Sequence, residues 1–587
     1  MGIAPGLVFL VKSLPYVIYP SAVAYGLIHA FAPDAPLPAV AAALVLAHPV
    51  FWFLEDTYRE WQIKRAAAAV GAVTAPSVPS ALPGGLSHMK FIRQHMNSGE
   101  PSTTTELWAE QMGTYVYQLN LQGDRRASPI VTLEPDHVKA ILATKFEDFD
   151  KGPFNYDVLH SLLGNGVFNA DGEMWKFHRS MTRPFFNKEK IAHFDIFDRH
   201  ADDLLRKVKT RLAEGFPIDF QDMIARFTLD SATEFLFGYD INSSGAGLPY
   251  PEYAKERNTE TFTKHPSNVF VKAFAEGQEL TVHRYRAGSA WRLVEFFSDS
   301  VNPRREVVND YVKMILNDPE FQKAAQATEK GNAADSASLL HHLVSYTKDP
   351  KVLTDEIINL LVAGRDTTMG TLSFGVYKLT AHPEIAQRLR EEVLEVVGPN
   401  RRPTYEDVRD MKYLRAFLNE VLRLYPVVPN NSRAANKDTT LPFKDKDRAP
   451  IFVPKGTRCS YSSYLIHRRK DLWGPTAGVF DPDRFLDERH AKYLVHNPYI
   501  FIPFNAGPRI CLGQQFAYNE MSFFLIRLLQ NFEAFELARE AQPKSSFKPE
   551  GAPKKPDAED EELMFASHLT MSVKDGLWVN MREAPAA

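Results

Sequence analysis

One segment of the sequence joins a tight turn to an apolar helix and puts a cysteine between them: Phe504-Asn505-Ala506-Gly507-Pro508-Arg509-Ile510-Cys511-Leu512-Gly513. Gly507 and Pro508 are turn-forming residues, and Gly513 allows another group to approach the backbone closely. We predict that an apolar helix runs over about 512–531. Cys511 then stands at a helix N-terminus, where free backbone N–H groups and the helix dipole favour a thiolate. Such a thiolate is suited to ligate a soft or borderline metal.

Two neighbours of this cysteine complete a pattern. Phe504 is placed to shield the sulfur from water, and Arg509 to meet an anionic cofactor group. A lone cysteine is more often a small buried hydrophobic residue, but Phe-x-x-Gly-x-Arg-x-Cys-x-Gly fixes five positions at set spacing. The pattern resembles the haem-binding loop of the cytochrome P450 superfamily. The resemblance implies that Cys511 is the axial thiolate ligand of haem b (iron protoporphyrin IX), with Phe504, Arg509 and Gly513 beside the cofactor.

The overall composition excludes several other classes of protein. The chain has 587 residues, a formal net charge of -4 and two cysteines. This charge gives no sign of nucleic-acid binding. Two cysteines exclude both a disulfide framework and an iron–sulfur cluster held by four cysteines of the chain. The second cysteine, Cys459, lies in a strand-like stretch, and we interpret it as structural.

Residues 1–65 are typical of a membrane anchor. Lys12 and Asp34 are the only charged residues before Glu55, and segments 13–33 and 35–54 are each about long enough to span a bilayer. Prolines interrupt both segments, so two spans, or one span with an interfacial segment, fit the pattern. A cleaved signal peptide fits less well, because the apolar stretch is too long and lacks a basic start. A cytosolic exit is favoured by the cations that follow, Arg59, Lys64 and Arg65.

Two further regions follow the anchor. Residues 66–90 are rich in Pro, Gly and Ala and predict a linker. Residues 91–587 are predicted to form a mainly α domain with a small β region, which is the cytochrome P450 fold that the resemblance implies. The expected strand pair lies near 114–120 and 129–132. Two segments are predicted to be exposed loops, 324–338 and 540–562.

A polar run interrupts an apolar predicted helix, 353–379. It reads Ala363-Gly364-Arg365-Asp366-Thr367-Thr368, which is locally unfavourable for a helix. The run is explained either by a kink without catalytic meaning or by an oxygen pocket. In the second case Gly364 leaves room, the Thr367 hydroxyl bonds dioxygen and Asp366 relays protons. The run resembles the central-helix motif of cytochromes P450, and more narrowly that of fungal alkane and fatty-acid hydroxylases.

Two motifs are implied to face the haem propionates. Trp175 and Arg179 are four residues apart and share one face of a predicted helix. Alone they indicate only an amphipathic helix, but Trp-x-x-x-Arg resembles the superfamily's propionate-binding helix, and an indole N–H and a guanidinium both donate to carboxylates. By the same resemblance, Arg433 meets a propionate.

A third motif has a structural role. Glu420 and Arg423 form Glu-x-x-Arg, which alone is a common ion pair of small value. In the family this pair is joined by an arginine from Pro-Glu-Arg-Phe, which corresponds to Arg484 here. Asp483 departs from the usual glutamate, but its side chain is not a member of the triad. The triad is expected to hold the proximal core.

The resemblance implies a haem-thiolate monooxygenase that inserts one oxygen atom of O2 into an aliphatic C–H bond. Long-chain alkanes or fatty acids, hydroxylated at or near the terminus, are favoured on two grounds. The oxygen-site stretch and the stretch after Glu-x-x-Arg both resemble fungal alkane and fatty-acid hydroxylases. The residues expected at the haem are also apolar: Leu360, Ala363, Val427 and Val428. Asn430 or Asn431 is a candidate to hold a polar end. The alternatives are a broad-specificity xenobiotic or aromatic-oxidising cytochrome P450, a peroxygenase or isomerase, and a non-enzymatic haem sensor.

Electrons must come from another protein, because the chain has no Gly-x-Gly-x-x-Gly dinucleotide fingerprint. The resemblance implies NADPH-cytochrome P450 reductase, with Lys176 and the Arg468–Lys470 run as candidate contacts or merely as solvated charges. The other expected partners are a lipophilic small-molecule substrate, O2 and a membrane, but no nucleic acid. We expect the chain in the endoplasmic reticulum membrane, with the catalytic domain facing the cytosol.

Overall fold

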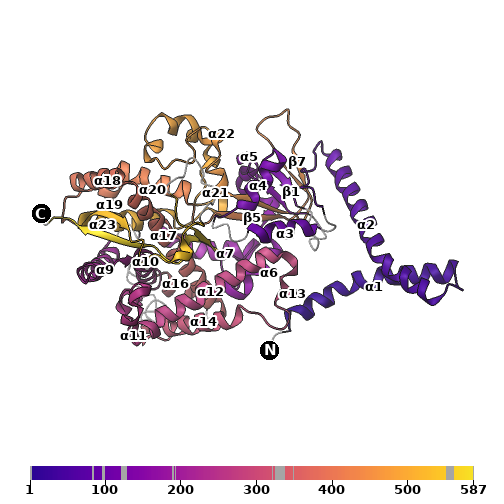
Figure 1. Cartoon of the computed structure of the whole chain (residues 1–587), viewed down its shortest axis with the longest axis horizontal. Coiled ribbons are helices and arrows are strands. Elements are labelled where there is room, and N and C mark those ends of the chain that lie inside the picture. Colours follow the sequence, from indigo (N-terminus) through magenta and orange to yellow (C-terminus); the bar gives the residue numbers. More distant parts are fainter. Residues whose placement is uncertain are drawn as a thin grey trace.

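The computed structural model has a mainly helical body from which two long helices extend (Figure 1). The predicted fold class, mainly α with small β sheets, is confirmed. The described residues are 3–81, 85–95, 100–119, 128–187, 191, 194–319, 322–323, 338–347, 349–549 and 561–585. Most of the predicted loop 324–338, and the central part of the predicted loop 540–562, lie outside these residues.

The body is built around α17 (Pro350–Ala381). Pro350 occupies its first turn, and the Asp349 carboxylate accepts a hydrogen bond from the Lys351 N–H. The helix is continuous through the polar run 364–368, so the predicted helix 353–379 is confirmed. It packs against α10 (Phe220–Phe237), α14 (Asn302–Leu316), α20 (Lys412–Leu424) and α23 (Gln514–Asn531).

The other helices cover this core on several sides. The longer ones are α6 (Gly152–Leu163), α7 (Gly172–Thr182), α9 (Asp195–Ala213), α12 (Pro266–Ala287) and α18 (Pro383–Val396). The shorter ones are α3 (Leu86–His95), α4 (Thr103–Met112), α5 (Pro135–Lys139), α11 (Glu260–Lys264), α13 (Trp291–Val294), α16 (Leu339–Tyr346), α19 (Tyr405–Asp410), α21 (Ser463–Ile466) and α22 (Lys470–Trp473).

The largest sheet among the described residues has the order β1-β2-β8-β5-β3. Its strands are β1 (Val116–Gln118), β2 (Ile130–Thr132), β3 (Phe149–Asp150), β5 (Asn430–Ala435) and β8 (Arg458–Ser462). The predicted strand pair is confirmed, since β1 and β2 are antiparallel with Tyr117 opposite Val131. Cys459 is fully buried in β8, as expected for a structural cysteine.

Three smaller sheets complete the β region of the described chain. One has the order β4-β12-β9, and the other two are the pairs β6–β7 and β10–β11. Their bounds are β4 (Ile218–Asp219), β6 (Thr439–Leu441), β7 (Ile451–Val453), β9 (Phe532–Leu537), β10 (Phe565–Ser567), β11 (Met571–Val573) and β12 (Trp578–Glu583).

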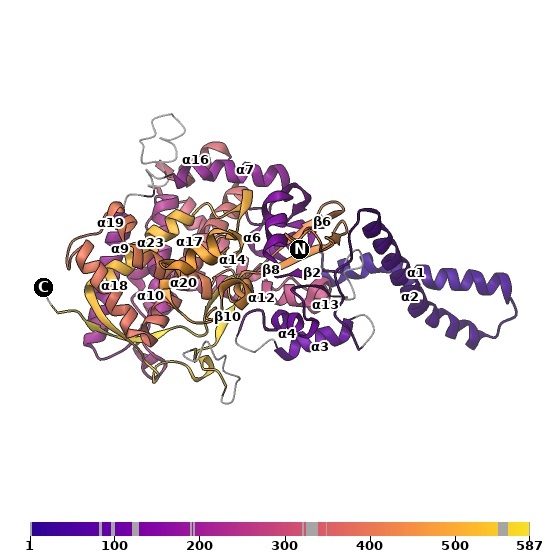
Figure 2. The same cartoon turned by 90° about the horizontal axis from the view of Figure 1, so that it is seen from above.

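The two N-terminal helices form a hairpin that points away from the body in both views (Figures 1 and 2). They are α1 (Pro5–Phe31) and α2 (Leu37–Ala69), and both are long and apolar enough to cross a membrane. The Ser21 hydroxyl lies 3.0 Å from Nε2 of His48 between them. At the start of α1, the Gly6 N–H donates to Phe296 O of the body at 2.9 Å. The hairpin is suited to anchor the body in a membrane.

The segment expected to be a linker is largely packed against the body. Its first residues continue α2 to Ala69. Val73 N–H then donates to Pro450 O, and Phe452 N–H donates to Val73 O, each at 2.9 Å or less. The next contact is with β1, where Val78 N–H donates to Gln118 O at 3.0 Å. The sequence composition predicted a linker, and within it these backbone hydrogen bonds fix residues 73–78 on the sheets.

Candidate functional site

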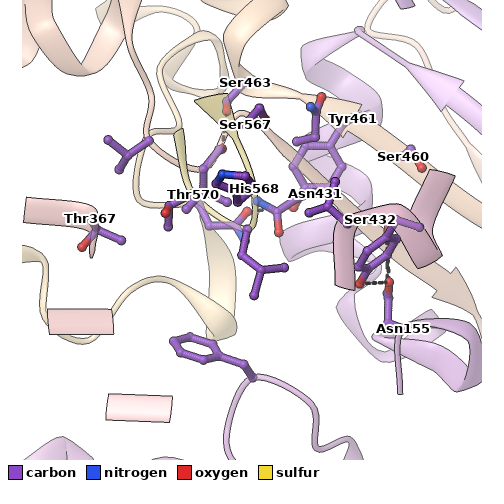
Figure 3. Close-up of a pocket in the computed structure, with 18 of the residues that line it drawn as sticks. Asn155, Thr367, Asn431, Ser432, Ser460, Tyr461, Ser463, Ser567, His568 and Thr570 are labelled. Carbon is purple, nitrogen blue, oxygen red and sulfur yellow. Dashed lines mark hydrogen bonds between the residues drawn. The ribbon is translucent and has the colours of Figure 1, made fainter. Parts of the chain in front are cut away.

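A cavity of about 830 Å³ lies between α17, the cysteine segment and the β10–β11 turn. Figure 3 shows Thr367 of α17 on one side of it, with His568 and Thr570 of the β10–β11 turn and Asn431 of β5 across from it. Most of the predicted site residues line this cavity: Trp175, Arg179, Leu360, Ala363, Thr367, Val427, Val428, Arg433, Phe504, Arg509, Cys511 and Gly513. Residues from distant parts of the sequence therefore meet at one site.

The turn before Cys511 holds its thiol at the cavity wall. Cys511 N–H donates to Phe504 O at 3.0 Å, which closes the loop. Gly507 has φ of 69°, and a Cβ added there would clash with Leu142 O, so only glycine fits. The helix α23 begins at Gln514, slightly later than the predicted 512. Gly513 N–H, just before that helix, is hydrogen-bonded to the sulfur.

The thiol is open to the cavity, although protein atoms surround it closely. Burial raises the pKa of Cys511, and the Gly513 N–H and the Arg179 charge oppose that effect. In the protein without a metal ion, desolvation thus outweighs the groups that were expected to favour a thiolate at Cys511. A metal ion reverses this balance, because a ligating thiol is deprotonated on binding.

Three cations gather on one side of the cavity: Lys151, Arg433 and Arg509. Burial and the charges of both arginines lower the pKa of Lys151, and Asp171 only partly offsets them. Burial lowers the pKa of Arg509 to about 10. Several desolvated cations with one carboxylate between them are unfavourable unless anions bind. The two propionates of a haem fit this need.

The geometry of Arg509 adds to its predicted role. Its guanidinium donates to Asp171 at 2.7 Å and to Ala170 O at 3.0 Å, and it lies over the Trp175 ring at 4.4 Å. Nε of Arg509 is buried without a hydrogen-bond partner. The Asp171 carboxylate already offsets part of the charge of Arg509. Because the guanidinium lies over the Trp175 ring, Arg509 also helps to position Trp175. Lys151 was not predicted, because a single Lys before Gly-Pro carries no recognisable signal.

The polar run of α17 faces in two directions. Thr367 lines the cavity, and its hydroxyl donates to Ala363 O at 2.7 Å. Asp366 is buried away from the cavity lining and accepts hydrogen bonds from Gln278 Nε2 at 2.8 Å and from Arg365 at 2.5 Å. A Cβ on Gly364 would lie 2.8 Å from Cβ of Ala232. The glycine is therefore needed for the contact between α17 and α10, rather than only to leave room for oxygen.

The predicted structural triad is assembled and fully buried. Arg423 donates two hydrogen bonds to the Glu420 carboxylate, at 2.7 and 2.8 Å. Nε of Arg484 lies 3.6 Å from the same carboxylate. Arg423 and Arg484 also donate to backbone carbonyl groups, including Ala477 O and Thr476 O. Glu420 thereby ties α20 to the 476–484 segment.

The structure corrects the expected surface role of the Arg468–Lys470 run. Arg468 donates to Leu424 O and stacks on Tyr464 at 3.7 Å. Arg469 is buried and pairs with Asp471 at 2.5 Å. Only Lys470 of this run is exposed. Lys176 is also exposed and pairs with Glu173, so these two lysines are the remaining candidate docking residues.

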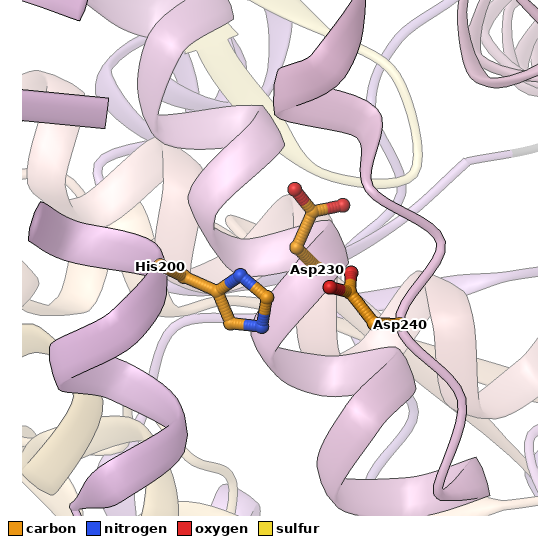
Figure 4. A group of neighbouring side chains, drawn as sticks. All are labelled: His200, Asp230 and Asp240. Atoms are coloured by element: carbon orange, nitrogen blue, oxygen red, sulfur yellow. The ribbon is translucent and has the colours of Figure 1, made fainter. Parts of the chain in front are cut away.

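A second group of possible metal ligands lies elsewhere in the body (Figure 4). The ligand atoms of His200, Asp230 and Asp240 all lie within 4.8 Å of one another. His200 Nε2 is already hydrogen-bonded to Glu234 at 2.7 Å. Asp230 accepts hydrogen bonds from two backbone N–H groups of the following turn, and Asp240 accepts one. These contacts give the three side chains a structural role.

Comparison with known proteins agrees with the geometry. A family model described as Cytochrome P450 matches residues 116–558. Cytochrome P450 52A3-A of Candida maltosa is 38% identical over 467 residues, covering 77% of this chain and 81% of its own. Cytochrome P450 52E1 of Candida apicola is 37% identical over 412 residues, covering 70% and 76%. Cytochrome P450 monooxygenase pvhE of Talaromyces variabilis is 34% identical over 486 residues, covering 78% and 84%.

Proposed function

Because this chain belongs to the cytochrome P450 family and is a cytochrome P450 monooxygenase, we propose that it hydroxylates long-chain alkanes or fatty acids at or near the terminal carbon. Membership of the family implies a haem with cysteine thiolate ligation, a redox partner, and a lipophilic substrate together with O2. In this chain we propose haem b as the cofactor and NADPH-cytochrome P450 reductase as the electron donor.

The observation that carries this proposal is the apolar wall of the cavity. Leu360, Ala363, Val427 and Val428 line it, and Leu159, Leu163, Leu236, Phe565 and Leu569 extend the apolar surface. Each buried methylene contributes about 0.8 kcal/mol, so affinity is expected to rise with chain length until the cavity is full. Terminal attack requires steric control, because a terminal C–H bond is stronger than an internal one. A wall that admits only the chain tip near the iron supplies that control.

We propose that Cys511 ligates the haem iron and that Phe504 and Gly513 lie beside it. The haem, when bound, supplies the oxygen activation that C–H insertion needs. Trp175, Arg179, Arg433, Arg509 and the additional Lys151 are proposed to hold its propionates. Glu420, Arg423 and Arg484 keep the proximal core in place.

Two residues of α17 are proposed to deliver protons. The Thr367 hydroxyl lies at the cavity wall, where it would hold a proton on the side of the cavity at which oxygen is activated. Asp366 precedes Thr367 in α17, and its carboxylate accepts hydrogen bonds from Gln278 at 2.8 Å and from Arg365 at 2.5 Å. We propose that this carboxylate relays protons from solvent toward Thr367.

We also propose how the chain is placed in the cell. Residues 1–65 serve as the anchor in the endoplasmic reticulum membrane, residues 66–90 connect it to the body, and residues 91–587 form the catalytic domain on the cytosolic side. The cations after the apolar part of α2 support this orientation. Lys176 and Lys470 are proposed contacts for the reductase, because both are exposed.

A substrate panel with reductase and NADPH tests the proposed function. The full-length protein is given saturated fatty acids, alkanes of increasing length, and polycyclic aromatic compounds, with Cys511→Ala as the inactive control. We expect NADPH-dependent hydroxylation of the aliphatic series, with the hydroxyl group at or near the chain end. Turnover of the aromatic compounds without any aliphatic product overturns the proposal in favour of a xenobiotic oxidase. Turnover without reductase indicates a peroxygenase, and no turnover of any compound indicates a sensor.

A further inference from the structure

One guanidinium near the end of α12, that of Arg286, lies at the cavity. Arg286 lines the cavity together with Val282 and the segment 287–290, and it is accessible to solvent. Within the described part of the chain it makes no hydrogen bond and no ion pair. Burial lowers the pKa of Arg286, and the charge of Glu279 on the same helix raises it by less. A guanidinium at the edge of an apolar cavity, without a protein partner in the described chain, is available to bind an anion there.

Three neutral side chains of the cavity lining already have partners within the protein. The Tyr285 hydroxyl donates to Asn155 Oδ1 at 2.8 Å, and Asn155 Nδ2 donates to Lys151 O at 2.5 Å. Asn430, which the sequence suggested as a group for a polar substrate end, accepts a hydrogen bond from the Ser102 hydroxyl at 2.7 Å. These neutral groups lack the charge that matches a carboxylate.

The remaining charges near Arg286 do not neutralise it. Glu279 and His283 are exposed residues of the same helix. His568, in the β10–β11 turn, lines the cavity (Figure 3). Burial lowers the pKa of His568 and Arg286 lowers it further, while Glu279 and Asp366 raise it. A neutral imidazole and a guanidinium thus face the cavity together.

We propose that Arg286 binds the carboxylate of a fatty-acid substrate, and that its chain then extends along the apolar wall toward Cys511. This inference rests on the proposed function and names its substrate class, a long-chain carboxylic acid. A guanidinium matches a carboxylate with two parallel hydrogen bonds, which fixes orientation as well as affinity. Arg286 extends from α12, whereas Cys511 precedes α23, so the acid-binding group and the oxidising site lie on different elements of the cavity wall. Holding the acid end at Arg286 presents the methyl end to the oxidising site.

Spin-state titrations of the full-length haem protein test this assignment. Palmitate and methyl palmitate have the same chain, but only palmitate carries a charge. Both are titrated into wild type, Arg286→Gln, Arg286→Lys and Lys272→Gln in identical lipid nanodiscs. Lys272 is an exposed cation of the same helix and does not line the cavity, so it is the matched control. The CO-bound spectrum of each variant checks that the haem site is intact.

We expect Arg286→Gln to weaken palmitate binding about tenfold or more, as for the loss of a charged hydrogen bond, and to leave methyl palmitate within twofold. Arg286→Lys should retain part of the preference for the acid, and Lys272→Gln should behave as wild type. An unchanged ratio of the two affinities in Arg286→Gln overturns the role of Arg286, while the aliphatic function stands. Failure of both ligands to bind wild type, alongside binding of aromatic compounds, overturns the proposed function itself.

Discussion

The backbone N–H of Ile502 donates to Nε2 of His467 at 2.9 Å. The other ring nitrogen, Nδ1, lies 3.0 Å from Arg423 O, so it must carry the proton. Arg423 belongs to the structural triad on α20, and Ile502 comes two residues before Phe504. A neutral imidazole therefore connects the triad to the cysteine segment. Burial lowers the pKa of His467 to about 3, which keeps the ring neutral.

This histidine predicts a loss of stability in mild acid. The unfolded chain protonates His467 near its ordinary pKa of about 6.5, whereas the folded protein does so only near 3. The unfolded state thus binds more protons between these values, and the free energy of unfolding falls as the pH drops through that window. We expect the titration of His467 to lower the free energy of unfolding by about 2 kcal/mol between pH 7 and pH 5. Urea unfolding of wild type and His467→Gln at both pH values measures it.

Glutamine is the matched replacement, because its amide donates to Arg423 O and accepts from Ile502 without titrating in this range. His137, whose pKa is also lowered to about 3 by burial, is unchanged in the variant, so only the difference between the two proteins is interpreted. An equal pH dependence in wild type and His467→Gln would contradict the prediction.

The two cysteines are predicted to differ in their spectra. Cys511→Ala should lose the red-shifted Soret band that a reduced, CO-bound thiolate-ligated haem gives. Cys459→Ala should keep the band, because Cys459 is buried in β8 away from the cavity lining. Its cost in stability should be roughly 1 kcal/mol, from the small volume removed. Loss of the band in Cys459→Ala alone would show that the ligand is misassigned.

The acid and the alcohol of α17 are predicted to affect coupling. Thr367→Ala should retain haem but release reducing equivalents as peroxide, and Asp366→Asn should slow turnover, because an amide does not relay protons as a carboxylate does. Thr371→Ala is the control: it removes a similar hydroxyl one turn later, which donates to Thr367 O at 3.0 Å. The ratio of product to NADPH consumed is the measurement. Equal ratios in Thr367→Ala and Thr371→Ala would remove Thr367 from the mechanism.

Features with a local signal were predictable from the sequence. The cysteine loop, the helix around Asp366 and the β1–β2 pair each depend on residues close together in the chain, so turn formers and periodicity were sufficient. Lys151 was missed because its importance comes from Arg433 and Arg509, which are hundreds of residues away. The surface role of Arg468 was wrong for the same reason, since its partners Leu424 and Tyr464 are brought to it only by folding.

The packed segment 73–78, which belongs to the connection 66–90, is predicted to stabilise the catalytic domain. A protein that starts at Gly71 keeps the backbone hydrogen bonds to Pro450 and Gln118 and the buried side chains of Ala72, Ala75 and Val78. A protein that starts at Leu86 loses all of these. We expect the longer form to give the CO spectrum with less membrane association, and the shorter form to unfold at a lower temperature. Equal melting temperatures for the two forms would show that this segment adds no stability.

The close approach of Gly364 to Ala232 predicts a coupled pair of substitutions. Gly364→Ala puts a methyl group 2.8 Å from Cβ of Ala232, which is fully buried on α10. The better helix propensity of alanine adds up to about 1 kcal/mol of stability, but overpacking typically costs about 1–3 kcal/mol. Ala232→Gly makes space for the new methyl group. We therefore expect it to recover stability in the Gly364→Ala background, although it is destabilising alone.

A double-mutant cycle on the free energy of unfolding measures this coupling, which we expect to be about 1–2 kcal/mol in favour of the double variant. Turnover and peroxide release are measured on the same four proteins. If Gly364 instead serves mainly to leave room for oxygen, Gly364→Ala will uncouple the reaction at unchanged stability, and Ala232→Gly will not restore it. The cycle thus separates a glycine needed for helix packing from one needed at the oxygen site.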